Sequence, residues 1–174
     1  CLGTLEGEDR NAVAFQLALL LKDQVGDLGG AVEILQGLLD VDGGDRDAVV
    51  EALEGVLLVS GADAYEVVAP RVALLITPIL EEAEEWERLS RVLEAHARVT
   101  EDPPDAARHW VALAAVQEEQ LGRPAEAFEA IAEAVRLDPE SREVVDSLQR
   151  LAAAAGLEDR LVEFSGRGGI PVSL

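Results

Sequence analysis

Apolar residues recur along most of the chain at the three- and four-residue spacing of amphipathic helices, with polar residues on the intervening faces. Glycines or Asp-Pro steps stand where most of these segments end, as expected at the ends of helices. The pattern predicts helices over about 11–25, 29–40, 47–60, 70–84, 86–99, 105–121, 124–137 and 141–155, and a shorter one over 158–164. The predicted fold class is therefore all-α.

One part of the chain is a copy of another. The segment from Leu17 to Gly26 aligns with the segment from Leu113 to Gly122, so position 17 corresponds to position 113. Each copy is a helix that ends at a glycine turn and is followed by a second helix, so the repeated element is a helix pair. Stacked pairs share a core, with small residues where helices approach closely and larger ones between them. The small residues are Ala18, Ala31, Ala114, Ala127 and Ala134, and the larger ones are Leu17, Leu21, Leu35, Leu113 and Ile131.

These helix pairs predict a solenoid over residues 11–164, with about four to four and a half repeats. The predicted repeats cover 11–44, 45–69, 70–103, 105–139 and 141–164. The second is truncated, because residues 62–69 leave room for barely two helical turns before a helix that starts at Pro70, and the last is incomplete. Residues 1–10 are a flank, and the glycine-rich residues 165–174 predict a flexible tail.

The repeat over 105–139 carries the most complete set of signature residues. Trp110, Leu113, Ala114, Gly122, Ala127, Ala134 and Asp138-Pro139 occupy the positions of the Trp-Leu-Gly, Gly, Ala, Ala and Asp-Pro signature of tetratricopeptide repeats, with one extra residue before the glycine. The chain resembles that family over residues 11–164, as divergent copies similar to degenerate arrays in large bacterial proteins. The resemblance implies a right-handed superhelix of antiparallel helix pairs whose first helices line a concave groove.

The same resemblance implies which residues line that groove. They are Ala12, Phe15, Leu19, Lys22 and Asp23 in the first repeat, and Arg108, Val111, Ala115, Glu118 and Glu119 in the fourth. The polar clamp with which some members hold a C-terminal carboxylate is absent, because Phe15, Leu19 and Val111 are apolar. An apolar groove with acidic edges suits an amphipathic helix, or an extended segment that carries Arg or Lys. The alternative is that Phe15 and Leu19 are buried against the next repeat.

Composition narrows the class of partner. The chain has 174 residues, of which 49% are hydrophobic, enough for one domain with a core of Leu, Val and Ala. Its 35 acidic and 14 basic residues give a formal charge of -21, which repels nucleic acid and favours basic peptides or other cations. Alternatively, the acidic surface only keeps a helical protein soluble.

The residues that could carry chemistry do not combine into a recognisable site. His96 and His109 lie on different predicted helices, without the spacing of a helical metal pair, and His96 is expected to be structural. Residues 40–45 resemble a calcium loop but carry Gly44 where a ligand is needed, so they predict a turn. The acidic run over 81–87 predicts a solvated face. We expect no enzymatic activity, no cofactor and no bound metal.

No membrane segment is expected, because the most apolar stretch, Val67 to Leu80, is short and contains Arg71 and two prolines. The single cysteine, Cys1, excludes an internal disulfide framework, although a chain that starts at cysteine could be lipid-modified after processing. The chain contains no methionine, which is expected of a segment of a longer array or of a processed protein. A cytoplasmic location is expected.

Three functional hypotheses follow. The first is a protein-interaction scaffold that binds a basic or amphipathic protein segment in its groove. The alternative is a structural, self-associating segment of a larger helical-repeat protein, with no peptide ligand. The third is an enzyme or metal protein, for which the sequence offers no constellation of residues.

Overall fold

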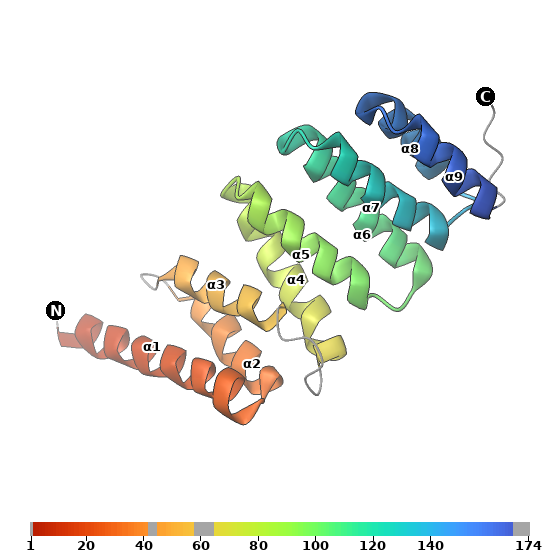
Figure 1. The fold of residues 1–174 in the computed structure, drawn as a ribbon. Coiled ribbons are helices and arrows are strands. Elements are labelled where there is room, and N and C mark those ends of the chain that lie inside the picture. The colour runs from red at the N-terminus through yellow and green to blue at the C-terminus, as the bar shows by residue number, and fades with distance from the viewer. Residues whose placement is uncertain (1, 42–44, 58–64, 169–174) are drawn as a thin grey trace. The chain divides into compact units, whose positions relative to one another are not determined.

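The computed structural model describes residues 2–41, 45–57 and 65–168, and the elements in these ranges are all helical (Figure 1). They are α1 (Leu2–Leu20), the π-helical turn η1 (Leu21–Val25), α2 (Leu28–Leu39), α3 (Arg46–Leu57), α4 (Tyr65–Glu82), α5 (Trp86–Val99), α6 (Pro103–Ala115), the π-helical turn η2 (Val116–Gln120), α7 (Pro124–Leu137), α8 (Arg142–Ala155) and α9 (Glu158–Gly168). The predicted all-α class is confirmed.

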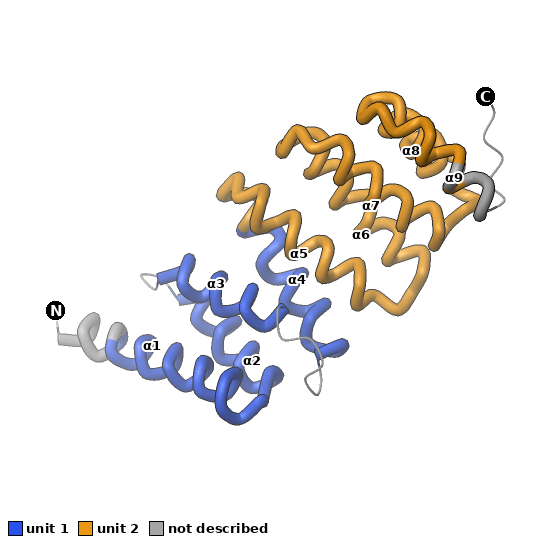
Figure 2. The backbone as a smooth tube through the Cα atoms, in the orientation of Figure 1, with its two compact units in different colours: residues 1–79 blue, residues 80–174 orange. Residues whose placement is uncertain are grey.

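The chain divides into two compact units, residues 1–79 and 80–174 (Figure 2). In the first unit α1 packs against α2, and α2 packs against α3. In the second unit each helix from α5 to α9 packs against the next one in the sequence. From α1 to α3 and from α5 to α9, helices that follow one another in the chain are therefore neighbours in space.

Four helix pairs turn in the same way. The first helix of each pair is followed by a residue in the left-handed backbone region, and the second helix begins two residues later. These residues are Gly26 (φ 76°), Glu84 (φ 56°), Gly122 (φ 64°) and Gly156 (φ 66°), which join α1 to α2, α4 to α5, α6 to α7 and α8 to α9. Glycine adopts this conformation without a steric penalty, whereas Glu84 does not.

Two of the four turns contain one residue more than the others. In the turns after η1 and η2, the N–H that follows the left-handed residue donates to the carbonyl six residues earlier, whereas after α4 and α8 it donates to the carbonyl five residues earlier. The bonds are Asp27 to Leu21 (3.0 Å) and Arg123 to Gln117 (2.7 Å) in the longer turns, and Glu85 to Leu80 (2.9 Å) and Leu157 to Ala152 (2.8 Å) in the shorter ones. A π-helical turn accommodates one inserted residue. It accounts for the extra residue before Gly122 in the sequence.

The core contains most of the residues that the sequence assigned to it. Every predicted small residue is at most 3% exposed, from Ala18 and Ala31 in the first copy to Ala114, Ala127 and Ala134 in the second. Leu35, Leu113 and Ile131 are also buried, and Leu21 is half-buried. Leu17 is different: its exposed fraction is 46%, so its assignment to the core was wrong.

The start of α4 differs from the prediction. This helix begins at Tyr65 and not at Pro70, so both Pro70 and Pro78 lie inside it. The Tyr65 hydroxyl donates to the Leu57 carbonyl at 2.9 Å, which ties the start of α4 to the end of α3. Val68 and Ala69 are buried, and we attribute the early start to this burial, which offsets the backbone bond that Pro70 cannot make.

The ends of the chain also differ from the prediction. Helix α1 begins at Leu2, so most of the expected flank over 1–10 is helical. Helix α9 continues to Gly168, so the first residues of the expected tail over 165–174 are helical too, and the remainder lies outside the described residues. Composition therefore underestimated the helical extent at both ends.

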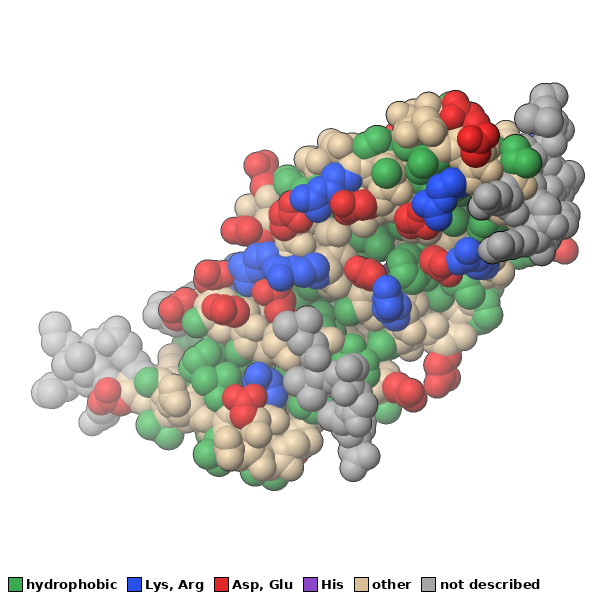
Figure 3. All heavy atoms as spheres, viewed as in Figure 1, with side chains coloured by type: hydrophobic (Ala, Val, Ile, Leu, Met, Phe, Trp, Pro, Cys, Tyr) green, Lys and Arg blue, Asp and Glu red, His purple; other side chains and the backbone are tan. Residues whose placement is uncertain are grey.

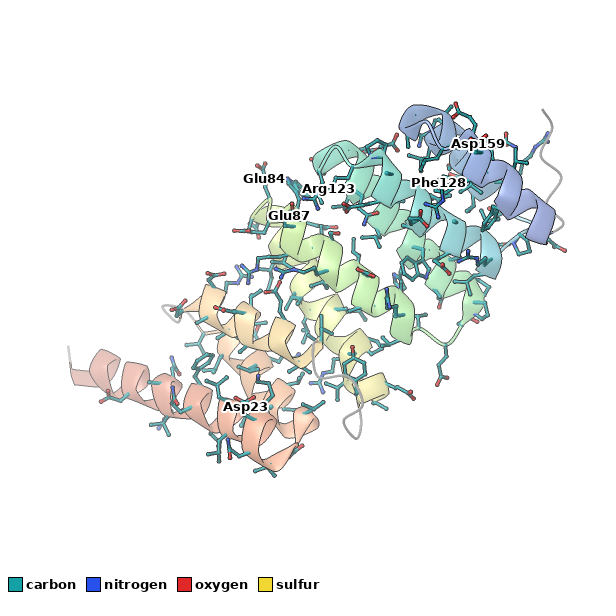
Figure 4. The ribbon with its side chains drawn as sticks, viewed as in Figure 1. Asp23, Glu84, Glu87, Arg123, Phe128 and Asp159 are labelled. Carbon is teal, nitrogen blue, oxygen red and sulfur yellow. The ribbon has the colours of Figure 1, made fainter. Side chains whose placement is uncertain are left out.

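Polar contacts join alternate helices. In the first compact unit Arg71 of α4 donates to Gln36 of α2 at 2.5 Å. In the second, carboxylate–arginine pairs join α5 to α7, η2 to α8, and α7 to α9. Figure 4 labels Glu87 and Arg123, which form the first of these pairs. These pairs are Glu87–Arg123, Glu118–Arg150 and Glu129–Arg160. The partners in the four contacts stand 31 to 36 residues apart, about the length of one helix pair. Solvent screens such pairs, so each contributes little to stability, but together they favour one register between repeats.

Candidate partner-binding surface

Helix α6 positions the predicted groove residues of the second copy. Its start is fixed by Asp102, whose carboxylate accepts the Asp105 N–H at 3.2 Å, and by two prolines in the first turn. Beyond that turn Arg108, Val111 and Ala115 follow one another at helical spacing and are all exposed. They form one edge of α6.

A hollow of about 300 Å³ lies between α6 and α8, inside the second compact unit. It is lined by Pro104, Ala107, Arg108, Val111, Asp138, Ser141, Glu143, Val144 and Ser147. The apolar side chains of Ala107, Val111 and Val144 thus stand beside the carboxylates of Asp138 and Glu143. Two of the predicted groove residues, Arg108 and Val111, belong to this hollow.

The charge of Arg108 is compensated locally. Its guanidinium pairs with the Asp105 carboxylate one turn earlier, and its Nε lies 3.5 Å from the Pro104 carbonyl. Asp138 and Glu143 add further negative charge to the rim of the same hollow. A bound cationic side chain would therefore meet a net negative surface.

A second hollow, of about 240 Å³, contains two more predicted residues, Ala115 and Glu119. The rest of its lining comes from Glu81, Trp86, Leu89, Val116 and Gln120. Its lining combines aromatic and aliphatic side chains with two carboxylates. The first hollow likewise combines aliphatic side chains with two carboxylates. Four predicted residues of the second copy, on α6 and η2, are thus divided between two hollows, and Glu118 lines neither of them.

Glu118 has a different environment. Both of its carboxylate oxygens face the Arg150 guanidinium of α8, with Oε2 accepting a bond from Nη2 at 2.9 Å. The hydrogen bond from Arg150 lowers the pKa of Glu118, and the same bond raises the pKa of Arg150. Glu118 therefore holds η2 against α8 and differs from Glu119, whose exposed side chain lines a hollow.

The predicted residues of the first copy are less accessible. Phe15 and Leu19 are half-buried, between full burial and the exposure of their counterparts in α6. Lys22 is 15% exposed and pairs with Asp23 at 2.8 Å (Figure 4). Its Nζ lies only 3.3 Å from the position that a Cβ on Gly55 of α3 would take. The absence of a side chain at Gly55 thus gives the lysine its place between η1 and α3.

The two histidines are together in space, which the sequence spacing did not indicate. The rings of His96 on α5 and His109 on α6 stack with centroids 3.9 Å apart and an interplanar angle of 27°. Burial, together with the nearby His109, lowers the pKa of His96 to about 4. Burial also lowers the pKa of His109, against the opposing effect of Asp105. His96 is 6% exposed, as expected of a structural histidine, but its partner could only be found from the packing of the two helices.

Among the described residues no cluster of three or more His, Cys, Asp or Glu side chains could hold a metal ion. Residues 42–44 of the rejected calcium loop lie outside those residues. The carboxylates of the acidic run over 81–87 are exposed, as predicted. No described helix combines the length and the apolar character needed to cross a bilayer.

Comparisons with protein-family models, with curated proteins and with solved structures found no match for this chain. The assignment to the tetratricopeptide-like family therefore stays a prediction from the sequence.

Proposed function

We propose that this chain is a protein-interaction scaffold, a right-handed solenoid of tetratricopeptide-like helix pairs that binds a basic or amphipathic protein segment. The observation that carries the proposal is the hollow between α6 and α8. Arg108 and Val111 are predicted groove residues, and both line this hollow together with residues of α8, the first helix of the next pair.

The chemistry of the surface supports a cationic partner. Each of the two hollows along α6 combines apolar side chains with two carboxylates, Asp138 and Glu143 in one, Glu81 and Glu119 in the other. The whole chain carries a formal charge of -21, which accelerates encounter with basic segments. An amphipathic helix would place its apolar side chains on Val111 and Val144 and its basic side chains on the rim.

The direct test uses a fluorescein-labelled synthetic helix of leucine and lysine in amphipathic order, with fluorescence anisotropy as the readout. We expect saturable binding that weakens as salt rises. The double variant Glu119→Arg/Glu143→Arg should raise Kd at least fivefold, because it reverses one rim charge in each hollow. Glu118 is unsuitable for this purpose, since its reversal would break the pair with Arg150.

The matched control is Glu51→Arg/Glu66→Arg, which makes the same two charge reversals at exposed sites on α3 and α4, outside both hollows. It should change Kd less than twofold. An equal loss in the control and in the double variant would show that only the net charge matters, and the assignment of the groove would then be wrong.

A further inference from the structure

Helix α1 exposes an apolar stripe. Val13, Leu17 and Leu20 lie on successive turns of one face, with exposed fractions of 68%, 46% and 52%. Figure 3 shows hydrophobic side chains at the surface in the region of this helix. We call these three residues the α1 stripe. Contiguous exposed apolar surface of this kind is typical of a contact site for another macromolecule.

In the second copy, the equivalent face of α6 is covered by another helix. When position 17 is aligned with position 113, the residues equivalent to the α1 stripe are His109, Leu113 and Val116. Leu113 is 1% exposed, His109 stacks on His96 of α5, and Val116 shares a hollow with Trp86 and Leu89 of α5. Helix α5 therefore covers on α6 the face that is exposed on α1.

The two copies agree in the buried side of the helix and in the turn that follows it. Ala18 and Ala114, on the opposite side of the two helices, are both buried. Both copies end in a π-helical turn and a left-handed glycine, with the same hydrogen bond across the turn. Because the helix and its turn are the same, the difference in exposure reflects the covering helix and not a different conformation.

We propose that the α1 stripe is the docking site of an amphipathic helix with basic flanks, packed on α1 as α5 packs on α6. The start of α5, at Trp86 and Leu89, lies near the end of α6, and His96 lies near its middle, so the occupant runs antiparallel to α1. The occupant carries apolar side chains at the spacing of Trp86, Leu89 and His96.

Charge defines the flanks of the occupant. Asp9 and Asp23 lie one turn beyond either end of the α1 stripe, and both are exposed, with Asp23 also paired with Lys22. Arginine or lysine at the ends of the occupant would meet these carboxylates. The proposal does not rest on the groove of α6 and α8, because the α1 stripe belongs to the first compact unit and the groove to the second.

The probe is a labelled synthetic peptide with the sequence of residues 84–101 and the substitutions Glu84→Arg, Glu85→Arg and Glu101→Arg, which give it basic ends, titrated into the full chain. We expect saturable binding, and a Kd at least threefold higher at low salt for the unsubstituted 84–101 peptide, whose ends are acidic. Leu17→Asp in the chain should raise Kd at least tenfold, because it places a charge in the centre of the apolar contact. Val67→Asp, at an apolar residue of α4 that is 78% exposed, should change it less than twofold.

Methyl NMR of the unmodified chain gives a readout that needs no variant. The resonances of Val13, Leu17 and Leu20 should shift with the same Kd as the anisotropy.

Absence of saturable binding, or equal effects of Leu17→Asp and Val67→Asp, would overturn the proposal. Dimerisation of the chain alone that is lost in Leu17→Asp, measured by sedimentation, would also overturn it, since a second copy would then be the occupant. The variant Glu119→Arg/Glu143→Arg should bind this probe normally, so failure here is distinguishable from failure of the proposed groove.

Discussion

At the scale of single residues, comparison of the two copies identifies side chains that are not optimal for stability. Gln117, in the second copy, is 8% exposed, and its Oε1 has no hydrogen-bond partner among the described residues. Its counterpart in the first copy is Leu21, which has no polar side-chain atom. A buried acceptor without a partner costs about 1–3 kcal/mol. Gln117 therefore reduces the stability of the second compact unit.

Gln117→Leu should raise the free energy of unfolding by about 1 kcal/mol, because it removes the unpaired carbonyl and adds buried apolar surface. Urea denaturation monitored by circular dichroism measures the change. Gln120→Leu, at an exposed position of the same turn, should leave the free energy within about 0.5 kcal/mol of the wild type. A less stable Gln117→Leu protein would mean that the amide makes a favourable interaction.

At the scale of elements, the π-helical turns separate two kinds of helix pair. The pairs α1–α2 and α6–α7 have η1 or η2 before the left-handed glycine, whereas α8–α9 has a shorter turn closed by Leu157 and Ala152. The inserted residue is absorbed inside the turn, since Ala31 and Ala127 in the following helices are both buried. Turn length and core packing are therefore independent at this position.

Deletion of Gln120 should convert the turn after η2 to the shorter form and change the free energy of unfolding by less than about 1 kcal/mol. The control is deletion of Asp146 inside α8, which rotates the following residues by about 100° and moves Leu148 and Leu151 out of the core. That deletion should cost several kcal/mol. Comparable losses in the two proteins would show that η2 has a fixed structural role.

The contact between α5 and α6 predicts a pH dependence. The pKa of His96 is about 4 in the folded protein and about 6.5 in the unfolded chain, so the unfolded state binds more protons between these values. The contribution of His96 to the free energy of unfolding should therefore decrease, on the order of 3 kcal/mol, as pH falls from 6.5 to 4. The charged neighbours Asp105 and Arg108 act on His109 in opposite directions.

His96→Phe keeps an aromatic ring against His109 and removes the titrating group, so its pH profile should be flatter than that of the wild type over this range. Denaturation at a series of pH values measures both profiles. Identical slopes would mean that His96 does not contribute to the acid sensitivity.

At the scale of the whole molecule, the sequence predicted what depends on local spacing. The helix pairs, their glycine turns and the buried alanines follow from apolar periodicity and from residues such as Gly122, and the structure confirms them. Contacts between helices were not predictable in the same way. The stack of His96 on His109 and the pair of Glu118 with Arg150 depend on the register between neighbouring helices, which periodicity does not determine. Leu17 has the spacing of a core residue, but its exposure depends on whether another helix covers α1.

The candidate groove was predictable only in part. Arg108 and Val111 line one hollow because they share one edge of α6. Lys22 has a different environment from its counterpart, Glu118. Gly55 has no side chain, so the lysine can lie against α3. Neighbouring helices therefore decide which residues of a repeated pattern are available to a partner.

The most direct test of the proposed scaffold function is methyl NMR of the full chain during titration with the amphipathic leucine and lysine peptide. Our proposal predicts saturable shifts of the Val111 and Val144 methyl resonances, with one Kd for both, and no saturable shift at the exposed Val67 and Val162. Shifts confined to other residues, or none that saturate, would contradict the assignment of the groove to α6 and α8.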